Sequence, residues 1–167
     1  MTRYQLAQVN VALPREPLDS PLLADFLAAL DPINRLADES PGFVWRLQAD
    51  DGNSTSVVWT PDERLIVNMS VWSSLDSLAD FVYRSAHTDV MRQRRKWFET
   101  LRLMMALWWI PRDHIPTVAE AAERVTRLGE HGPTPFAFTF RRAFPPPDAP
   151  HELGGRDQDR QERCPAP

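Results

Sequence analysis

The chain switches repeatedly between two hydrophobic periods, and this switching limits the folds that it can form. In the predicted strands, apolar side chains alternate with others or form a short buried run. These strands cover residues 4–11, 43–48, 65–72 and 103–110. Residues 20–36 and 75–98 instead repeat apolar side chains every three or four positions, as helices do. The order βαββαβ predicts an α+β fold with a ferredoxin-like core, in which helices cover one face of an antiparallel sheet.

Local signals indicate where the predicted helices begin and end. Ser20 is expected to cap the first helix, with Pro21 in its first turn, and Gly42 follows its end. The dipeptide at residues 31–32 predicts either a restart of this helix or a kink within it. The second helix is expected to be the longest of the chain and to bend near Ser85.

Beyond this core, the pattern predicts one added helix and one added strand. Thr117 and Glu120 have the spacing of a capping box, and the apolar stripe that follows runs up to Gly129. A last strand is predicted over residues 136–140, and residues 57–59 are predicted to extend the second strand as part of a hairpin.

The composition predicts one domain over residues 1–144 and a disordered tail over residues 145–167. The tail holds six of the sixteen prolines and eight charged residues, with almost nothing able to pack. A net charge of −4 argues against nucleic-acid binding. No signal peptide or membrane span is indicated, so a cytoplasmic protein is expected. The one cysteine, Cys164, excludes an internal disulfide and a multi-cysteine metal cluster.

A sheet with helices on one face needs something to cover the other face. The face predicted to lie uncovered is mixed and aromatic, so a second subunit or a ligand is expected against it rather than water. It carries Ile66, Asn68, Ser70 and Trp72, together with Phe43, Trp45 and Leu47 or their alternates.

Several short motifs resemble a bacterial family of unknown function. They are LAQVN at 6–10, NMSVW at 68–72, SAH at 85–87, RRKWF at 94–98 and GPTPFAF at 132–138. The resemblance covers about residues 3–141. It places the chain in the dimeric α+β barrel superfamily, alongside antibiotic-biosynthesis and haem-degrading monooxygenases. It implies a homodimer with two sheets face to face. In each subunit it implies a cavity between the sheet and the long helix, often with an aromatic or polyketide-like guest.

One stripe of the long helix combines polar and apolar side chains. His87, Met91, Arg94 and Phe98 recur at helical spacing, and Trp97 lies beside them. His87 is therefore a candidate general base, ligand hydrogen-bonding group or haem ligand, because imidazole titrates near neutral pH. The alternative is structural: His87 would cap the bend in the helix, and Arg94 would pair with Glu99 or Asp89.

A second set of candidate residues lies on two strands that are neighbours in a ferredoxin-like sheet. Gln8 and Asn10 on the first strand and Asn68 and Ser70 on the third are expected to converge. Uncharged groups of this kind can orient a carbonyl or phenol without the cost of burying charge. Trp72 alternates with them and is the best candidate among the tryptophans for a ligand contact. Alternatively, these polar groups satisfy one another across a dimer interface.

The haem-degrading branch has an Asn on the first strand and a Trp and a His in the long helix. Asn10 matches the first of these, but the Trp position here holds Phe81, and His87 falls several residues early. The monooxygenase branch uses neither metal nor flavin. It needs a shaped cavity, a base, and hydrogen-bond donors that polarise a carbonyl. In this chain the base and the donors can come from His87, Asn10, Asn68 and Trp72.

The leading hypothesis is therefore a homodimeric, cofactor-free monooxygenase-like enzyme, or a cyclase or isomerase. Its substrate is expected to be a small hydrophobic, aromatic or polyketide-like molecule. The alternatives are a non-catalytic ligand-binding protein on the same fold and a haem protein with His87 as axial ligand, so whether the chain is catalytic stays open. No metal site is expected. The catalytic candidates are His87, Asn68 and Asn10; the substrate-binding candidates are Trp72, Ser70, Gln8, Met91, Arg94 and Trp97.

Overall fold

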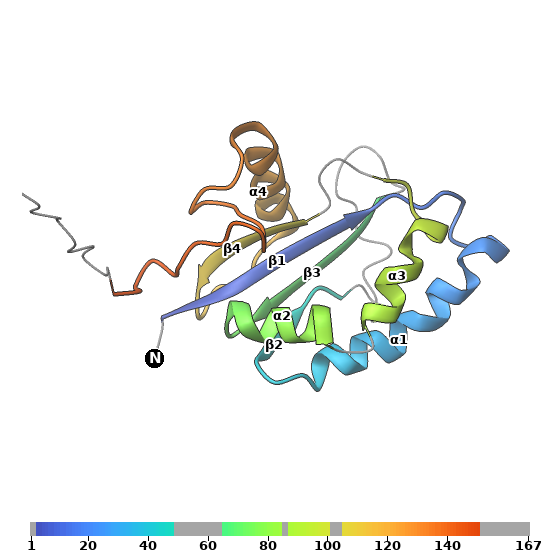
Figure 1. Ribbon diagram of the computed structural model, residues 1–167, viewed down its shortest axis with the longest axis horizontal. Coiled ribbons are helices and arrows are strands. Elements are labelled where there is room, and N and C mark those ends of the chain that lie inside the picture. The colour runs from blue at the N-terminus through green and yellow to red at the C-terminus, as the bar shows by residue number, and fades with distance from the viewer. Residues whose placement is uncertain (1–2, 49–64, 85–86, 101–104, 151–167) are drawn as a thin grey trace, which may run out of the picture.

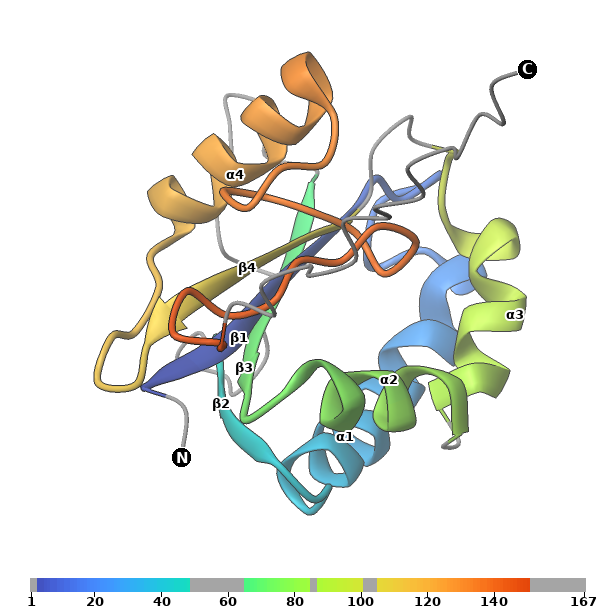
Figure 2. The same ribbon diagram turned by 60° about the vertical axis from the view of Figure 1, so that its left-hand side comes forward.

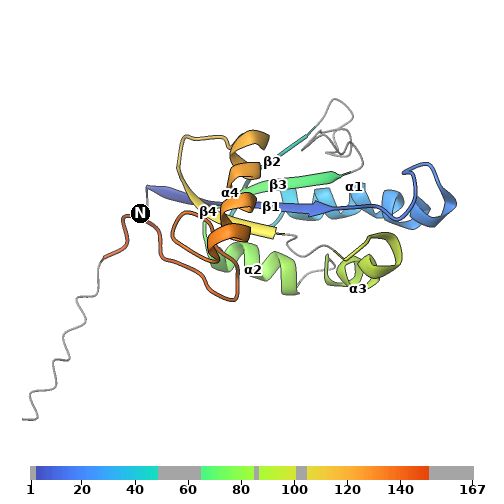
Figure 3. The same cartoon turned by 90° about the horizontal axis from the view of Figure 1, so that it is seen from above.

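The computed structural model describes the backbone of residues 3–48, 65–84, 87–100 and 105–150, and the side chains of these residues except 87–91. Four antiparallel strands form one sheet in the order β2-β3-β1-β4. The strands are β1 (Tyr4–Ala12), β2 (Phe43–Arg46), β3 (Ile66–Trp72) and β4 (Met105–Pro111). Figure 3 shows β1 between β3 and β4, so the first strand of the chain is central in the sheet.

Four α-helices and one short 3-10 helix accompany the described strands (Figure 1). They are η1 (Pro21–Leu23), α1 (Ala24–Asp38), α2 (Leu75–Arg84), α3 (His87–Trp97) and α4 (Val118–His131). With α4 set aside, the order of elements and the order of strands are those of a ferredoxin-like core, so the predicted α+β fold class is confirmed. The stretch predicted as one bent helix is described as two, α2 and α3.

Some predicted details are wrong. Ser20 precedes η1, but its side chain makes no capping hydrogen bond. The last helix continues past Gly129 and ends at Gly132, whose φ of +71° suits glycine and whose N–H donates to the carbonyl of Leu128. Residues 136–140 make only isolated bridges, so they are not a strand. The predicted hairpin extension at residues 57–59 lies outside the described residues.

Helices α1, α2 and α3 cover one face of the sheet, and Figure 2 shows all three on the side opposite α4. Leu6, Trp72 and Leu107 point from three strands toward this side, where they pack with Leu78 of α2 and Ala37 of α1. The face predicted to lie uncovered, with Asn68, Ser70 and Trp72, is therefore the face beneath the helices. That prediction is wrong because the pleat fixes only which residues share a face, not which face the helices cover.

The opposite face of the sheet is apolar, and α4 packs against it. Ala7, Val9 and Trp108 are fully buried there, in a cluster with Ala121 and Leu128 of α4. The added helix thus buries in a single chain a face that would otherwise need another cover.

Strand β2 changes face partway along its length. Phe43 pairs with Trp72, but Trp45 pairs with Val71, so the register shifts between Phe43 and Trp45. A bulge of this kind breaks the alternation of side chains. As a result Phe43 packs beneath the helices, whereas Trp45 packs on the α4 side. The prediction that Phe43, Trp45 and Leu47 share a face is therefore wrong.

The segment after α4 crosses the edge of β4 and returns to the side of α1 and α2 (Figure 2). Phe138 forms two backbone hydrogen bonds with Leu107 of β4, at 2.8 and 2.9 Å, and is fully buried. The indole of Trp109 donates to the carbonyl of Phe144 at 2.8 Å. Asp148 accepts from the backbone N–H of Arg3 at 2.7 Å, which brings this segment next to the start of β1. Residues 151–167 of the predicted tail lie outside the described part.

In the described part of the chain, no helix combines the length and apolar character that a membrane span requires.

Glu120 joins α4 to β4 and to the loop between them. The N-cap half of the predicted capping box is present, because the Glu120 N–H donates to Thr117 Oγ1 at 3.1 Å. The Glu120 carboxylate turns instead to the indole of Trp108 at 3.0 Å and the ring of His114 at 2.7 Å. Burial alone would raise the pKa of Glu120. The hydrogen bonds from His114 and Trp108, with the charges of His114 and Arg124, outweigh burial and lower the pKa below its ordinary value of 4.5.

Glu120→Gln is expected to reduce the free energy of unfolding at pH 7 by about 1 kcal/mol, because charge-assisted hydrogen bonds are lost. A lowered pKa in the folded state means that the carboxylate stabilises the fold above pH 4.5. This contribution disappears as the pH falls through the lowered pKa. The difference from wild type should therefore shrink in acid, as measured by urea unfolding between pH 7 and pH 3. Glu123→Gln on the same helix is the control, since Glu123 is 56% exposed; an equal effect in both variants would contradict the assignment.

Candidate functional site

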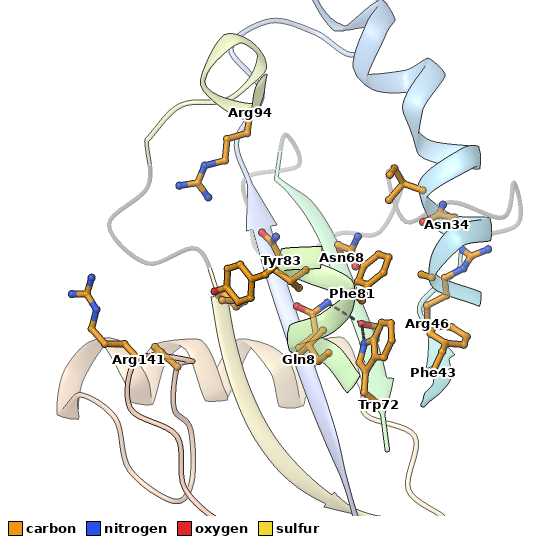
Figure 4. A pocket seen from close by; sticks show the side chains of 18 residues that line it. Gln8, Asn34, Phe43, Arg46, Asn68, Trp72, Phe81, Tyr83, Arg94 and Arg141 are labelled. Carbon is orange, nitrogen blue, oxygen red and sulfur yellow. Dashed lines mark hydrogen bonds between the residues drawn. The ribbon is translucent and has the colours of Figure 1, made fainter. Parts of the chain in front are cut away.

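A cavity of about 610 Å³ lies between the sheet and helices α1, α2 and α3. This size is within the range of pockets that hold drug-sized molecules. Figure 4 shows side chains from the strands on one side of it and from the helices around it. The described residues that line it are Gln8, Asn10, Ile33, Asn34, Ala37, Phe43, Arg46, Asn68, Ser70, Trp72, Leu78, Phe81, Val82, Tyr83, Arg94, Met105, Thr139 and Arg141.

A buried hydrogen-bond network forms the sheet wall of the cavity. Gln8 and Ser70 are opposite each other in the β1–β3 register, and Gln8 Nε2 donates to Ser70 Oγ at 2.9 Å. The indole N–H of Trp72 donates to the same oxygen at 2.9 Å. A hydroxyl accepts two hydrogen bonds and donates one, so Ser70 still has its O–H to donate. No described residue accepts it, which leaves this donor for a molecule in the cavity.

Three aromatic rings form the apolar part of the cavity. Trp72 is the central ring of the three and is fully buried. Phe81 of α2 stacks on it, with ring centroids 5.1 Å apart and planes at 27°. Phe43 meets it edge to face at 5.4 Å. Stacked and edge-to-face rings hold one another in place, so the buried Trp72 supports Phe81 and Phe43. These two rings are partly exposed and present a preformed surface for a flat apolar ligand.

Two amide side chains extend the polar wall beyond the buried network. Asn10 and Asn68 are direct partners in the β1–β3 register, two pairs along from Gln8 and Ser70 and on the same face of the sheet. Asn68 is exposed and Asn10 half-buried, and neither amide makes a hydrogen bond to another described residue. Each offers both a donor and an acceptor, so together they can orient a carbonyl or a hydroxyl.

The charged residues that line the described cavity are all arginines. Arg46 of β2 makes a two-pronged ion pair with Asp38 at the end of α1, at 2.8 and 3.3 Å. Arg94 comes from α3 and Arg141 from the segment that crosses β4. The guanidinium groups of Arg94 and Arg141 have no ion-pair or hydrogen-bond partner among the described residues.

Six of the residues proposed from the sequence meet at this cavity. Trp97 does not: it is buried in a separate cluster with Phe26 and Phe98, on the far part of α1 and α3. The backbone of His87 and Met91 belongs to α3, but their side chains lie outside the described part. The six that line the cavity are Gln8, Asn10, Asn68, Ser70, Trp72 and Arg94.

The sequence analysis missed several lining residues. Phe81 and Val82 belong to the apolar arc of α2, so helical periodicity was a usable signal for them. Arg46 was hidden by the bulge, which turns it to the side opposite Trp45. Nothing in the local pattern marks Arg141, because it lies in an irregular segment that only the tertiary structure brings across β4.

Within the described ranges, no three His, Cys, Asp or Glu side chains are arranged to hold a metal ion.

Ser70→Ala is expected to lower the free energy of unfolding by about 1–3 kcal/mol, because the buried N–H groups of Gln8 and Trp72 would lose their acceptor. Chemical denaturation followed by circular dichroism measures the change. Ser73→Ala is the control, since Ser73 is an exposed serine three residues along. A loss no larger than that of the control would show that the network contributes little to stability.

Comparison with known structures gives neighbours of low sequence identity. One is Rv0793 from Mycobacterium tuberculosis, with 14% identity and a TM-score of 0.46 over 68% of this chain and 99% of that one. Another, from Nitrosomonas europaea, is provisionally named an antibiotic biosynthesis monooxygenase; it has 12% identity and a TM-score of 0.44 over 70% and 97%. A protein from Chloroflexus aurantiacus with the same provisional name has 16% identity and a TM-score of 0.42 over 68% and 98%.

At this level of identity the likeness concerns only the path of the backbone. No curated protein matches the chain in sequence. A family model described as Domain of unknown function (DUF3291) matches residues 5–154, which is most of the chain. The resemblance of the short motifs to a family of unknown function is thereby confirmed. The chain belongs to this family, Domain of unknown function (DUF3291).

Proposed function

We propose that this protein binds a flat aromatic or polyketide-like molecule in the cavity and acts on it as a cofactor-free monooxygenase or a related proton-transfer enzyme. The composition of the cavity is the observation that supports the proposed ligand binding. The cavity lining combines the stacked pair Trp72 and Phe81 with the Ser70 O–H and two Asn amides, for which the described residues offer no hydrogen-bond partner. Such a surface favours a ring system that carries oxygen substituents, because rings need flat apolar contacts and oxygens need donors.

The proposed catalytic activity depends on residues of helix α3. Arg94 lines the cavity from α3, and His87 lies seven residues earlier, so both positions fall on the same face of the helix. We assign His87 the role of general base, because imidazole takes up a proton near neutral pH. Asn10 and Asn68 would hydrogen-bond the substrate oxygen on which negative charge develops.

The proposed oxygenation needs no oxidant other than molecular oxygen. The base removes a proton from an acidic C–H of the substrate, and the electron-rich carbanion is oxidised by O₂. When a ring methylene becomes a carbonyl, one oxygen atom enters the product and the other leaves in water. The substrate supplies all four electrons, which is why an electron-rich ring system is expected.

One observation favours a second candidate, a non-catalytic ligand-binding protein. Among the described lining residues, none has a side chain that ordinarily titrates between pH 5 and pH 8. Without His87 the cavity would bind and orient a molecule but would have no neutral-pH base.

Homodimer formation and a cytoplasmic location remain part of the proposal. Val9, Met69 and Val71, on the sheet face away from the cavity, are buried in the single chain. A second subunit would therefore meet the surface of α4 or a sheet edge and not bare sheet. A monomer in light scattering at micromolar concentration would contradict the dimer.

Phe81→Ala is expected to weaken binding of a neutral three-ring probe, anthracene-2-carboxamide, by roughly three- to tenfold, since one side of the aromatic cluster is lost. Quenching of tryptophan fluorescence on titration measures the dissociation constant. Phe136→Ala is the matched control, because Phe136 is 40% exposed and packs on Arg124 away from the cavity. Equal affinity in wild type and Phe81→Ala would contradict a ligand on this cluster.

His87→Gln separates catalysis from binding. If His87 is the base, uptake of oxygen with a hydroxylated anthrone should fall by about 100-fold or more, while fluorescence titration shows the substrate still bound. His131→Gln is the control, because His131 lies at the exposed end of α4. Binding without oxygen uptake in the wild type would favour the non-catalytic alternative.

A further inference from the structure

The charge of the cavity is opposite to the charge of the chain. The whole sequence has 23 acidic and 19 basic residues, with a net charge of −4. Yet among the described lining residues there are three arginines, Arg46, Arg94 and Arg141, and no Asp or Glu. A cluster of one sign inside a chain of the other sign raises the local concentration of ligands of opposite charge.

Two of these three positive charges have no acidic partner in the part of the chain that the structure describes. Arg46 is 15% exposed and is neutralised by its two hydrogen bonds to Asp38. Arg94 is half-buried and Arg141 exposed, and neither has an acidic partner among the described residues. The predicted partner Glu99 makes no ion pair with Arg94, and the side chain of Asp89 lies outside the described part.

Some arginines elsewhere on the molecule are neutralised by ion pairs. Arg84, Arg124 and Arg127 each pair with an acidic residue one helical turn away. Arg94 and Arg141 differ from the other arginines that have no acidic partner among the described residues because they line the cavity.

Figure 4 shows where the two groups lie. The guanidinium groups of Arg94 and Arg141 are on one side of the cavity, and Arg46 and Asn34 are on the other. Tyr83 lies on the side of the two unpaired arginines, and the aromatic pair of Trp72 and Phe81 lies between the two sides. A molecule with its rings on the aromatic pair would thus extend toward Arg94 and Arg141.

We propose that the ligand is an aromatic acid, with its rings against Phe81, which Trp72 supports, and with its carboxylate bound by Arg94 and Arg141. This inference rests on the proposed function, since it assumes a flat ligand in the same cavity. Guanidinium groups recognise carboxylates with short, charge-assisted hydrogen bonds, and they stay charged at any physiological pH. The acid would also orient the ligand, because only one end of it can meet the two arginines.

The test compares two probes of nearly the same shape, the charged anthracene-2-carboxylate and the neutral anthracene-2-carboxamide. Each is titrated into the full-length protein while tryptophan fluorescence is followed. We expect the carboxylate to bind about tenfold more tightly than the amide, and this preference to weaken at 0.5 M salt, where charges are screened. Arg94→Gln and Arg141→Gln should each weaken carboxylate binding by about three- to tenfold and weaken amide binding much less.

The neighbouring residues supply matched controls. Arg95 is exposed on the same helix as Arg94, and Arg142 follows Arg141, but neither lines the cavity. Arg95→Gln and Arg142→Gln change the net charge of the protein equally, so they should leave both dissociation constants unchanged. Equal losses in all four variants would mean that only overall charge matters and would overturn the proposal.

The outcomes also separate this inference from the proposed function. If both probes bind equally and both lose affinity in Phe81→Ala, the cavity binds aromatic molecules but the acid-binding inference is wrong. If the carboxylate binds and neither cavity arginine affects it, the inference is wrong in the same way. If neither probe binds, both the inference and the proposed cavity function are overturned.

Discussion

Strand β1 is hydrogen-bonded along both edges and covered on both faces, and the rest of the structure depends on this constraint. Its N–H and C=O groups pair with β3 on one side and β4 on the other. Each successive side chain must then enter one of two different layers. Ala7 and Val9 enter a dry apolar layer under α4, and Gln8 and Asn10 enter the layer that holds the cavity. A single slip in register would exchange the two layers and bury the amides in the dry core.

The cavity layer keeps its polar groups because they satisfy one another in part. Ser70 accepts from both Gln8 and Trp72, so two buried donors share one oxygen. This arrangement fixes the indole of Trp72, and the indole in turn supports Phe81 and Phe43. Preformed contacts of this kind reduce the ordering that a ligand must impose on the site when it binds. The Ser70 O–H, the two Asn amides and two arginines line the cavity and have no polar partner among the described residues.

Helix α4 and the segment after it change what the core fold exposes. The helix buries the apolar sheet face within one chain, held there by the contacts of Glu120 with Trp108 and His114. The segment then passes the β4 edge, buries Phe138, and brings Thr139 and Arg141 to the cavity. One addition to the core therefore closes one face of the sheet and completes the site on the other.

The sequence by itself determined the order of the core strands and helices, the α+β class, and which residues of β1 and β3 share a face. These follow from hydrophobic period, which is a local property. Gln8, Asn10, Asn68, Ser70 and Trp72 were predicted together for this reason. Only the tertiary structure decided which face the helices cover, that the bulge in β2 separates Phe43 from Trp45, and that Trp97 packs away from the cavity. It also decided that Arg141 joins the site. These outcomes depend on contacts between residues far apart in the chain. Such contacts produce no periodic pattern in the sequence.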